Sequence, residues 1–314
     1  MIKKFTQFPF VIYLILIVIF VAEVSIADTL ISKIDRSDGS RIIFYTKHIP
    51  KNRYEMLTVV IGGSACESIE PKFRSYSGIQ KYIKTSVLGV EKYGLSADST
   101  ACPKSYLDNN TIDQRIEDHI QAIKHVQKSR PGLTKLLLLA GSSGGYVVPG
   151  IIRSFRTNIS GIILLATGGG IQFKDELILL EKRKHGTQSS ENLRKKLAQY
   201  SKHGFVEQTW KGASNSANWW KSVLNLSLMP ELLTIDVPVF LAHGTQDLAV
   251  PVESADKIQE EFSKKMKDNL TYNRYVGLDH SWNTSNGESR ARKVIDDMLQ
   301  WIKVNHIKNW EIRK

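Results

Sequence analysis

Ser143, Asp247 and His280 follow one another along the chain, in an order and with side chains that suit nucleophilic catalysis. A serine hydroxyl alone is a weak nucleophile, but an imidazole can remove its proton, and a carboxylate can fix the imidazole tautomer and stabilise the imidazolium. Ser143 lies in GSSGG, which fits the pattern G-x-S-x-G, while Asp247 lies in HGTQDLAVP and His280 in GLDHSW. We therefore predict acyl transfer in which Ser143 attacks, His280 takes its proton and Asp247 orients His280.

Each of these residues follows a short apolar run that is typical of a buried strand, at residues 136–140, 237–242 and 272–276. Because the carboxyl ends of parallel strands meet at one edge of a sheet, we expect the three side chains to lie together there. Around Ser143 the order is strand, tight glycine turn, helix, and this context makes the pentapeptide informative. We expect strained backbone angles at Ser143 and the N–H of Gly144 beside its hydroxyl.

These residues also have structural interpretations. The glycine turn could be an ordinary strand-to-helix connection or a phosphate cradle. Asp247 could cap the helix that follows it. His243 and Asp279 compete for the same roles: we expect His243 to pack beneath the site, and Asp279, adjacent to His280 in sequence, to point away from it.

A second glycine-rich loop, Gly62-Gly63-Ser64, follows a β-branched strand at residues 57–61. It leaves backbone N–H groups at the carboxyl end of that strand, where an oxyanion would need them. We expect Gly144 and either Gly63 or Ser64 to form the oxyanion hole. A plain tight turn is the alternative.

The rest of the chain alternates strands with helices. Further strands are predicted at residues 41–46, 87–90 and 160–166, and helices at 109–128, 254–266 and 291–304. Residues 172–234 interrupt this alternation with charged helical segments and aromatic residues. The predicted fold class is α/β: a doubly wound, mostly parallel sheet with an inserted helical cap. Within the cap, Trp210, Trp219 and Trp220 could line an apolar substrate pocket or form the core of the cap itself.

The N-terminus reads as a targeting segment. Lys3 and Lys4 precede an apolar run at residues 8–22, and Ser25-Ile26-Ala27 resembles a cleavage site. We predict a signal peptide at residues 1–27 and one domain at 28–314, exported to the periplasm or secreted. The alternative is an uncleaved segment, residues 8–22, that associates the protein with the inner membrane.

Both cysteines, Cys66 and Cys102, lie in the exported part, and an even count in an oxidising compartment suggests one disulfide. Two unrelated buried thiols are the alternative. Neither cysteine has a C-x-x-C partner or a histidine pair, so no metal site is expected. Removing residues 1–27 lowers the net charge from +12 to +11. The lysines are scattered rather than interleaved with aromatics, and we predict no nucleic-acid binding.

Residues of about 40–305 resemble the α/β-hydrolase-fold serine hydrolases. GSSGG is similar to the family's nucleophile elbow, and HGTQDLAVP and GLDHSW to its acid and histidine loops. Gly62-Gly63-Ser64 sits where the family's oxyanion loop, often His-Gly-x, follows an early strand, although Ile61 replaces the histidine. The resemblance implies a cap between the strands near 161 and 237, no metal or organic cofactor, and Cys66 and Cys102 on loops that border the site.

These observations predict an exported, carboxylesterase-like serine hydrolase that acts through an acyl-enzyme on an ester or amide, its partner being a small-molecule ester or a short peptide. A serine peptidase resembling the prolyl-oligopeptidase catalytic domain is one alternative, weakened by the lack of a propeller-sized N-terminal region. A non-catalytic binding protein of the cell envelope with the same fold is another, and loss of a triad residue would be its signature. The sequence does not fix the oligomeric state.

Overall fold

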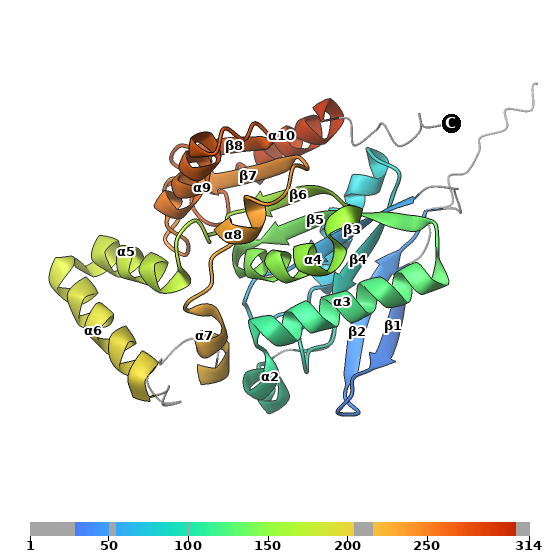
Figure 1. The fold of residues 1–314 in the computed structure, drawn as a ribbon, viewed down its shortest axis with the longest axis horizontal. Coiled ribbons are helices and arrows are strands. Elements are labelled where there is room, and N and C mark those ends of the chain that lie inside the picture. Colours follow the sequence, from blue (N-terminus) through green and yellow to red (C-terminus); the bar gives the residue numbers. More distant parts are fainter. Residues whose placement is uncertain (1–28, 50–54, 100, 204–215, 306–314) are drawn as a thin grey trace, which may run out of the picture.

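A computed structural model describes residues 29–49, 55–99, 101–203 and 216–305 (Figure 1). Within these ranges eight strands form one sheet in the order β1-β2-β4-β3-β5-β6-β7-β8. Strands β1 and β2 join it antiparallel, and all the others run parallel. The strands are β1 (Leu30–Asp35), β2 (Arg41–Lys47), β3 (Glu55–Ile61), β4 (Thr85–Val90), β5 (Leu133–Gly141), β6 (Ile159–Leu165), β7 (Val239–Gly244) and β8 (Leu270–Tyr275).

Helices cover both faces of this sheet, because its central strands are apolar on both faces, as β5 illustrates. Leu136 and Leu138 contribute to one buried apolar cluster, whereas Leu137 and Leu139 contribute to another on the opposite face. A strand buried on both faces reads as a continuous apolar run, because successive side chains point to opposite sides. This explains the run of four leucines.

The first cluster includes side chains of α3 (Ile112–Ser129), α4 (Val148–Phe155) and α9 (Val252–Lys264), and the second includes side chains of α1 (Glu70–Tyr76) and α10 (Ala291–Val304). Helix α3 begins where Thr111 caps it, its hydroxyl accepting a hydrogen bond from the N–H of Gln114. Shorter elements complete the chain: the helix α2 (Lys104–Asn109) and the 3-10 helices η1 (Ser77–Lys81), η2 (Ser142–Val147) and η3 (Arg156–Asn158).

A helical insertion separates β6 from β7. It contains α5 (Phe173–His185), α6 (Thr187–His203), α7 (Ala217–Val223) and α8 (Met229–Leu232). Helices α5 and α6 extend away from the sheet on the left of Figure 1, while α7 and α8 lie against the body of the molecule. The predicted fold class, a mostly parallel α/β sheet with an inserted helical cap, is confirmed.

Some elements were not predicted. Strand β1 is an edge strand whose Leu30 and Ile31 are exposed, so it lacks the buried apolar pattern of the inner strands. Helix α1 has only seven residues and buries only Phe73 among them. Such short, weakly patterned elements form because tertiary packing stabilises them, not because of their own periodicity.

Two predictions fall outside the described residues. The signal peptide or anchor at residues 1–27 is one, and Trp210 of the predicted substrate pocket is the other. Among the residues that the structure does describe, no helix has both the length and the hydropathy needed to cross a membrane.

Candidate active site

Ser142 occupies the sharp turn between β5 and the helices that follow. It is the first residue after the strand and opens η2, with a backbone φ of +52°. A residue other than glycine has a strained backbone in this left-handed region. Such strain is found most often at functional sites, where the surrounding structure enforces it. The turn thereby sets the Ser142 hydroxyl at the carboxyl edge of the sheet.

His280 links this hydroxyl to a buried carboxylate. Its Nε2 lies 3.1 Å from Ser142 Oγ, and its Nδ1 lies 2.7 Å from Asp247 Oδ2. Asp247 is fully buried, and its other oxygen accepts hydrogen bonds from the N–H groups of Ala249 and Val250 at 2.7 and 2.8 Å. The turn after β7 therefore fixes the carboxylate that faces the imidazole, while Asp247 does not act as a helix cap, since α9 begins at Val252.

The prediction that Ser143 faces His280 is wrong by one residue. Ser143 is buried, and its hydroxyl has no hydrogen-bond partner within the described part of the chain. With Ser142 at its centre the pentapeptide becomes Ala140-Gly141-Ser142-Ser143-Gly144, so alanine takes the place of the first glycine in G-x-S-x-G. The glycine pattern predicts that Ser143 occupies the sharp turn, whereas in the structure strand β5 ends at Gly141 and the turn falls on Ser142.

Gly144 and Gly145 are required by packing. A methyl group at Gly144 would lie 2.5 Å from the carbonyl oxygen of Ile61 and 2.6 Å from that of Gly62. A methyl group at Gly145 would lie 2.0 Å from Thr167 Cγ2. The turn therefore packs directly against the ends of β3 and β6, and Gly144 serves that close approach.

Gly63, one of the two residues predicted for the second oxyanion donor, lies beside Ser142. A methyl group on it would be 3.2 Å from Ser142 Cβ and 3.5 Å from Ser142 Oγ. The Ser64 carbonyl accepts a hydrogen bond from the Tyr106 hydroxyl at 2.7 Å.

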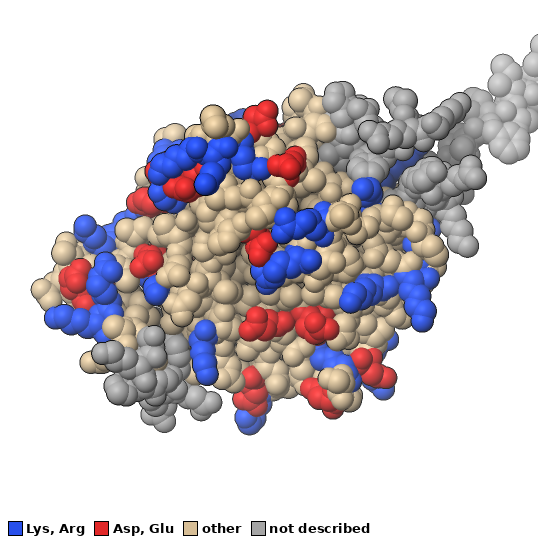
Figure 2. Space-filling view, viewed as in Figure 1, with Lys and Arg blue, Asp and Glu red and all other residues tan. Residues whose placement is uncertain are grey.

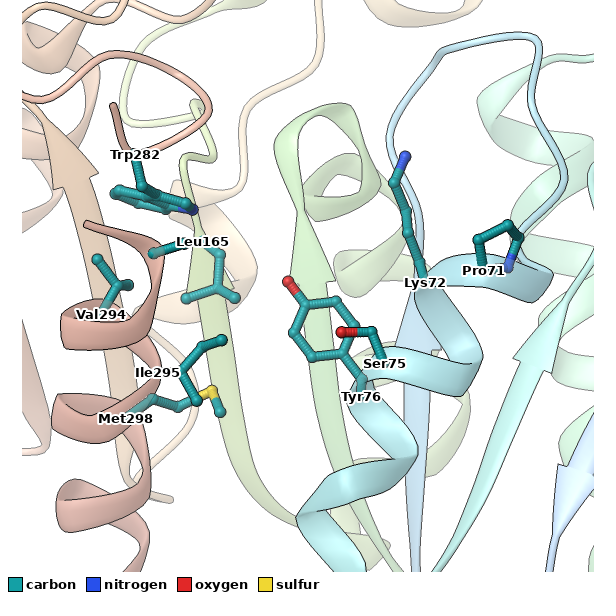
Figure 3. A pocket seen from close by; sticks show the side chains of 10 residues that line it. Pro71, Lys72, Ser75, Tyr76, Leu165, Trp282, Val294, Ile295 and Met298 are labelled. Carbon is teal, nitrogen blue, oxygen red and sulfur yellow. The ribbon is translucent and has the colours of Figure 1, made fainter. Parts of the chain in front are cut away.

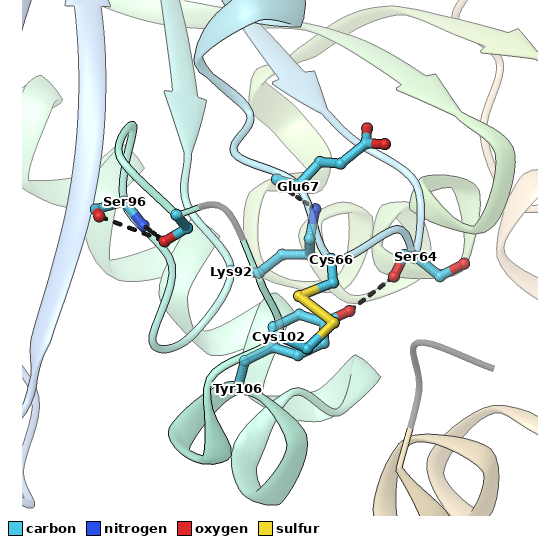
Figure 4. The surroundings of a disulfide bond; sticks show 8 residues. Ser64, Cys66, Glu67, Lys92, Ser96, Cys102 and Tyr106 are labelled. Atoms are coloured by element: carbon cyan, nitrogen blue, oxygen red, sulfur yellow. Dashed lines mark hydrogen bonds between the residues drawn. A yellow bond between two sulfur atoms is a disulfide. The ribbon is translucent and has the colours of Figure 1, made fainter. Parts of the chain in front are cut away.

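The Cys66–Cys102 disulfide ties the same loop to the segment that precedes α2 (Figure 4). Next to it the buried Lys92 donates a hydrogen bond to the Glu67 carbonyl at 2.9 Å. Burial, assisted by the charge of the nearby Arg115, lowers the pKa of Lys92 to about 7. We call residues 62–67 the glycine loop; buried donors and the disulfide together anchor it.

The two competing residues take other roles. His243 is fully buried below Asp247, its Nε2 lies 3.1 Å from the Val250 carbonyl oxygen, and burial lowers its pKa. Asp279 accepts hydrogen bonds from the N–H groups of Ser281 and Asn283, both at 2.8 Å, and so shapes the loop that carries His280. The carboxylate that contacts the His280 ring is Asp247.

Glu176 is a buried carboxyl group that sequence reasoning missed. It enters from the first turn of α5 and accepts hydrogen bonds from the Ser254 hydroxyl at 2.5 Å, the Gly169 N–H at 2.6 Å and the Tyr146 hydroxyl at 2.9 Å. Burial raises its pKa to about 7, although these hydrogen bonds oppose the rise. The sequence feature that could have indicated this buried carboxyl group is the run Gly168-Gly169-Gly170. A side chain there would clash with it, because a methyl group at Gly168 would lie 2.2 Å from Glu176 Oε1.

Trp219 and Trp220 belong to the packed interior. They are 2% and 8% exposed, and their rings meet edge to face with centroids 4.9 Å apart. Both also pack against Phe173 at the start of α5. Their positions match the alternative prediction, in which these tryptophans form the core of the insertion.

A cavity of about 330 Å³ lies between α1 and α10 (Figure 3). Two of its walls border the site: Leu165 neighbours Gly141 in the sheet, and Trp282 is two residues from His280. Ser142, His280 and Asp247 do not line it. Its lining is largely apolar and comprises Pro71, Lys72, Ser75, Tyr76, Leu165, Trp282, Ala291, Val294, Ile295 and Met298.

Basic and acidic side chains are interspersed over the face shown in Figure 2. Within the described ranges, no group of three or more His, Cys, Asp and Glu side chains is arranged to hold a metal ion.

Comparisons with known proteins reveal the fold. No protein-family model and no curated protein sequence matches the chain. Among solved structures, Est1E from Butyrivibrio proteoclasticus with bound ferulic acid is 18% identical, with a TM-score of 0.62 over 88% of this chain and 99% of that one. An esterase from Pyrococcus furiosus is 14% identical, with a TM-score of 0.57 over 88% and 91%.

The acylaminoacyl peptidase of Pyrococcus horikoshii is 11% identical, with a TM-score of 0.60 over 90% of this chain but 42% of the peptidase. Esterases and a peptidase thus share the architecture of this chain along most of its length. The order of the strands, the serine turn after β5, and the acid and histidine loops after β7 and β8 agree with that likeness. The chain has the α/β-hydrolase fold.

Proposed function

We propose that this protein is a serine hydrolase that cleaves carboxylic esters, with Ser142 as nucleophile, His280 as general base and Asp247 as the carboxylate that orients it. One observation carries the proposal: an unbroken chain of contacts runs from the strained Ser142 through both ring nitrogens of His280 to the buried Asp247. Nucleophile, base and orienting acid within hydrogen-bond reach are the signature of an activated serine.

In the first half-reaction, Ser142 Oγ forms a bond to the ester carbonyl carbon while its proton passes to His280 Nε2. The carbonyl oxygen becomes an oxyanion, and the N–H groups of Ser143 and Gly63 are the donors that we propose for it. The role predicted for the N–H of Gly144 thereby moves to Ser143, the residue that follows the nucleophile. Removing one such donor typically costs about 3 kcal/mol of transition-state stabilisation.

The intermediate then collapses. The bond to the alcohol oxygen breaks, that oxygen takes the proton from His280 Nε2, and the acyl group remains on Ser142. Water repeats the sequence: His280 removes its proton, its oxygen attacks the acyl carbon, and the carboxylic acid leaves as Ser142 regains its proton. Asp247 stabilises the imidazolium in both halves.

Esters are favoured over amides as substrates by the structural likeness to esterases. Est1E was solved with ferulic acid, an aromatic carboxylic acid, which supports including hydroxycinnamate esters among the substrates tested. The likeness to an acylaminoacyl peptidase supports amide hydrolysis as the second candidate activity. We also infer export of the chain, since a disulfide persists in an oxidising compartment.

Labelling with a fluorophosphonate probe tests the proposal, because the probe reacts with activated serines. We expect the wild type and Ser143→Ala to be labelled and Ser142→Ala to remain unlabelled. Because the buried Ser143 hydroxyl is unpaired, its removal should leave the fold intact. Labelling that persists in Ser142→Ala and disappears in Ser143→Ala would overturn the assignment, and folded wild type that takes up no label would favour the binding-protein alternative.

A further inference from the structure

The side chain of Arg115 has no evident structural reason to be a cation. It projects from α3 and is 2% exposed, and no carboxylate of the described residues lies within ion-pair distance of it. Asp118, one turn further along, pairs instead with Arg36 at 2.7 Å. Within the same described part of the chain, Nε and Nη1 of Arg115 have no hydrogen-bond partner. Burying an uncompensated charge is costly, so its retention calls for an explanation.

Among the described residues, this guanidinium has one hydrogen-bond partner, and it lies in the glycine loop: Arg115 Nη2 donates a hydrogen bond to the carbonyl oxygen of Gly62. That carbonyl belongs to the same peptide unit as the N–H of Gly63. The peptide is trans, so its C=O and N–H point in opposite directions. By holding the carbonyl on one side, Arg115 turns the Gly63 N–H to the other.

Gly63 lies on the side of this peptide that faces Ser142, because a methyl group added to its Cα would lie 3.2 Å from Ser142 Cβ and 3.5 Å from Ser142 Oγ. Within the described residues, the Gly63 N–H donates to no protein group. The peptide is thus bound at its carbonyl and has an unused donor beside the reacting serine. The positive charge of Arg115 also polarises it, which strengthens its N–H as a donor.

We propose that Arg115 is the positioning residue of the oxyanion hole: it fixes and polarises the Gly62–Gly63 peptide so that the Gly63 N–H binds the oxyanion. This inference rests on the proposed function, and it identifies Gly63 rather than Ser64 as the second donor. Ser64 has its own anchor, because its carbonyl is held by Tyr106. Arg115 itself touches no substrate atom and acts through the peptide.

Arg115→Met tests the proposal, because methionine fills a similar apolar volume without charge or donor. We expect kcat to fall about 100-fold, within the range seen when an oxyanion donor is lost, while KM stays nearly constant. Since a buried cation without a carboxylate is costly, the urea midpoint should stay the same or rise. The inhibition constant of a trifluoromethyl ketone, which forms a tetrahedral oxyanion on serine, should increase in parallel with the loss of kcat.

Tyr106→Phe is the matched control, since it removes the donor to the next anchored carbonyl of the same loop. We expect its kcat to stay within about threefold of wild type. Equal losses of kcat in the two variants would overturn the inference in favour of general anchoring of the loop. So would wild-type kcat in a folded Arg115→Met, or a loss that follows only its unfolded fraction. If Arg115→Met does not fold, Arg115→Lys, which keeps the charge but not the guanidinium geometry, takes its place: we expect its kcat to lie below that of the wild type, and a wild-type kcat in this variant would likewise overturn the inference.

The proposed function can fail separately from this inference. If Ser142→Ala retains the esterase activity, the proposed function is wrong and the role of Arg115 fails with it. If Ser142→Ala is inactive and Arg115→Met is as active as wild type, only the positioning role is wrong.

Discussion

At the scale of single residues, the serine turn depends on how closely two pieces of backbone approach. Gly144 faces the carbonyl oxygens of Ile61, the last residue of β3, and of Gly62, the next residue; these backbone atoms cannot move aside as a flexible side chain would. The same strand end leads into the glycine loop. The position of Gly144 thus controls the spacing between the Ser142 turn and the proposed oxyanion donor at Gly63.

We expect Gly144→Ala to destabilise the protein by about 3 kcal/mol, the upper part of the range for overpacking, because the added methyl group meets backbone at 2.5 Å. The folded fraction should also react more slowly with a fluorophosphonate. Urea unfolding and the rate of labelling measure the two effects. Gly78→Ala is the control: the methyl group there meets no atom within 4 Å, and stability should change little. Equal stability of the two variants would contradict this account.

The choice between Ser142 and Ser143 shows what the pattern of residues could not reveal. Both serines are flanked by small residues, and GSSGG satisfies the glycine motif only around Ser143. The backbone decides differently, because β5 continues through Gly141 and the left-handed residue is Ser142. Asp247 and His280 also had competitors, but each is the single residue of its type in the loop that follows its own strand.

At the scale of elements, Glu176 connects the insertion to the site. It joins α5 to the loop after β6, to η2 through Tyr146 and to α9 through Ser254. The sequence could not single it out, because the first turn of α5 looks like an exposed, charged helix end. Only the packing of Gly168-Gly169-Gly170 around its carboxyl group makes it a buried residue.

The raised pKa of Glu176 predicts a pH dependence of stability. Between pH 4.5 and about 7 the folded chain holds a proton on Glu176 that the unfolded chain has released. The free energy of unfolding therefore decreases as pH rises through this interval, by about 3 kcal/mol at most, and changes no further from this group above it. Glu176→Gln, which mimics the protonated carboxyl, should abolish this contribution.

The measurement is urea unfolding of wild type and Glu176→Gln at pH 5 and pH 8. The difference between the two proteins is the informative quantity. Burial lowers the pKa of His48, His119 and His243. These histidines make the free energy of unfolding increase with pH over part of the same range, but they do so equally in both proteins and cancel in the difference. Glu117→Gln, at an exposed position of α3, should behave as wild type does. A difference that does not grow in favour of Glu176→Gln at pH 8 would contradict the prediction.

At the scale of the whole molecule, the parallel part of the sheet could be predicted because its strands are buried on both faces. The continuous apolar runs at residues 136–140 and 160–166 predict such strands. The prediction that the site residues lie together at the carboxyl edge of the sheet follows from these strands. Strand β1 and the short helices α1, α2, α7 and α8 could not be predicted in this way. They lie at an edge or within loops, where contacts distant in sequence determine the structure.

The disulfide is the long-range covalent link of the described chain, and its effect can be measured against the alternative of two independent buried thiols. Cys66 and Cys102 are 36 positions apart, and a loop of this length corresponds to about 4 kcal/mol in the chain-entropy model, which is an upper value. We expect Cys66→Ser, Cys102→Ser and the double variant to lose the same stability, because each removes the same bond. Losses in urea unfolding that add up in the double variant would mean that the two thiols are independent.

Reduction of the wild type should reproduce the loss and raise its mass by two hydrogens. The glycine loop would then lose one anchor while Arg115, Tyr106 and Lys92 retain theirs, so we expect kcat to fall less on reduction than in Arg115→Met.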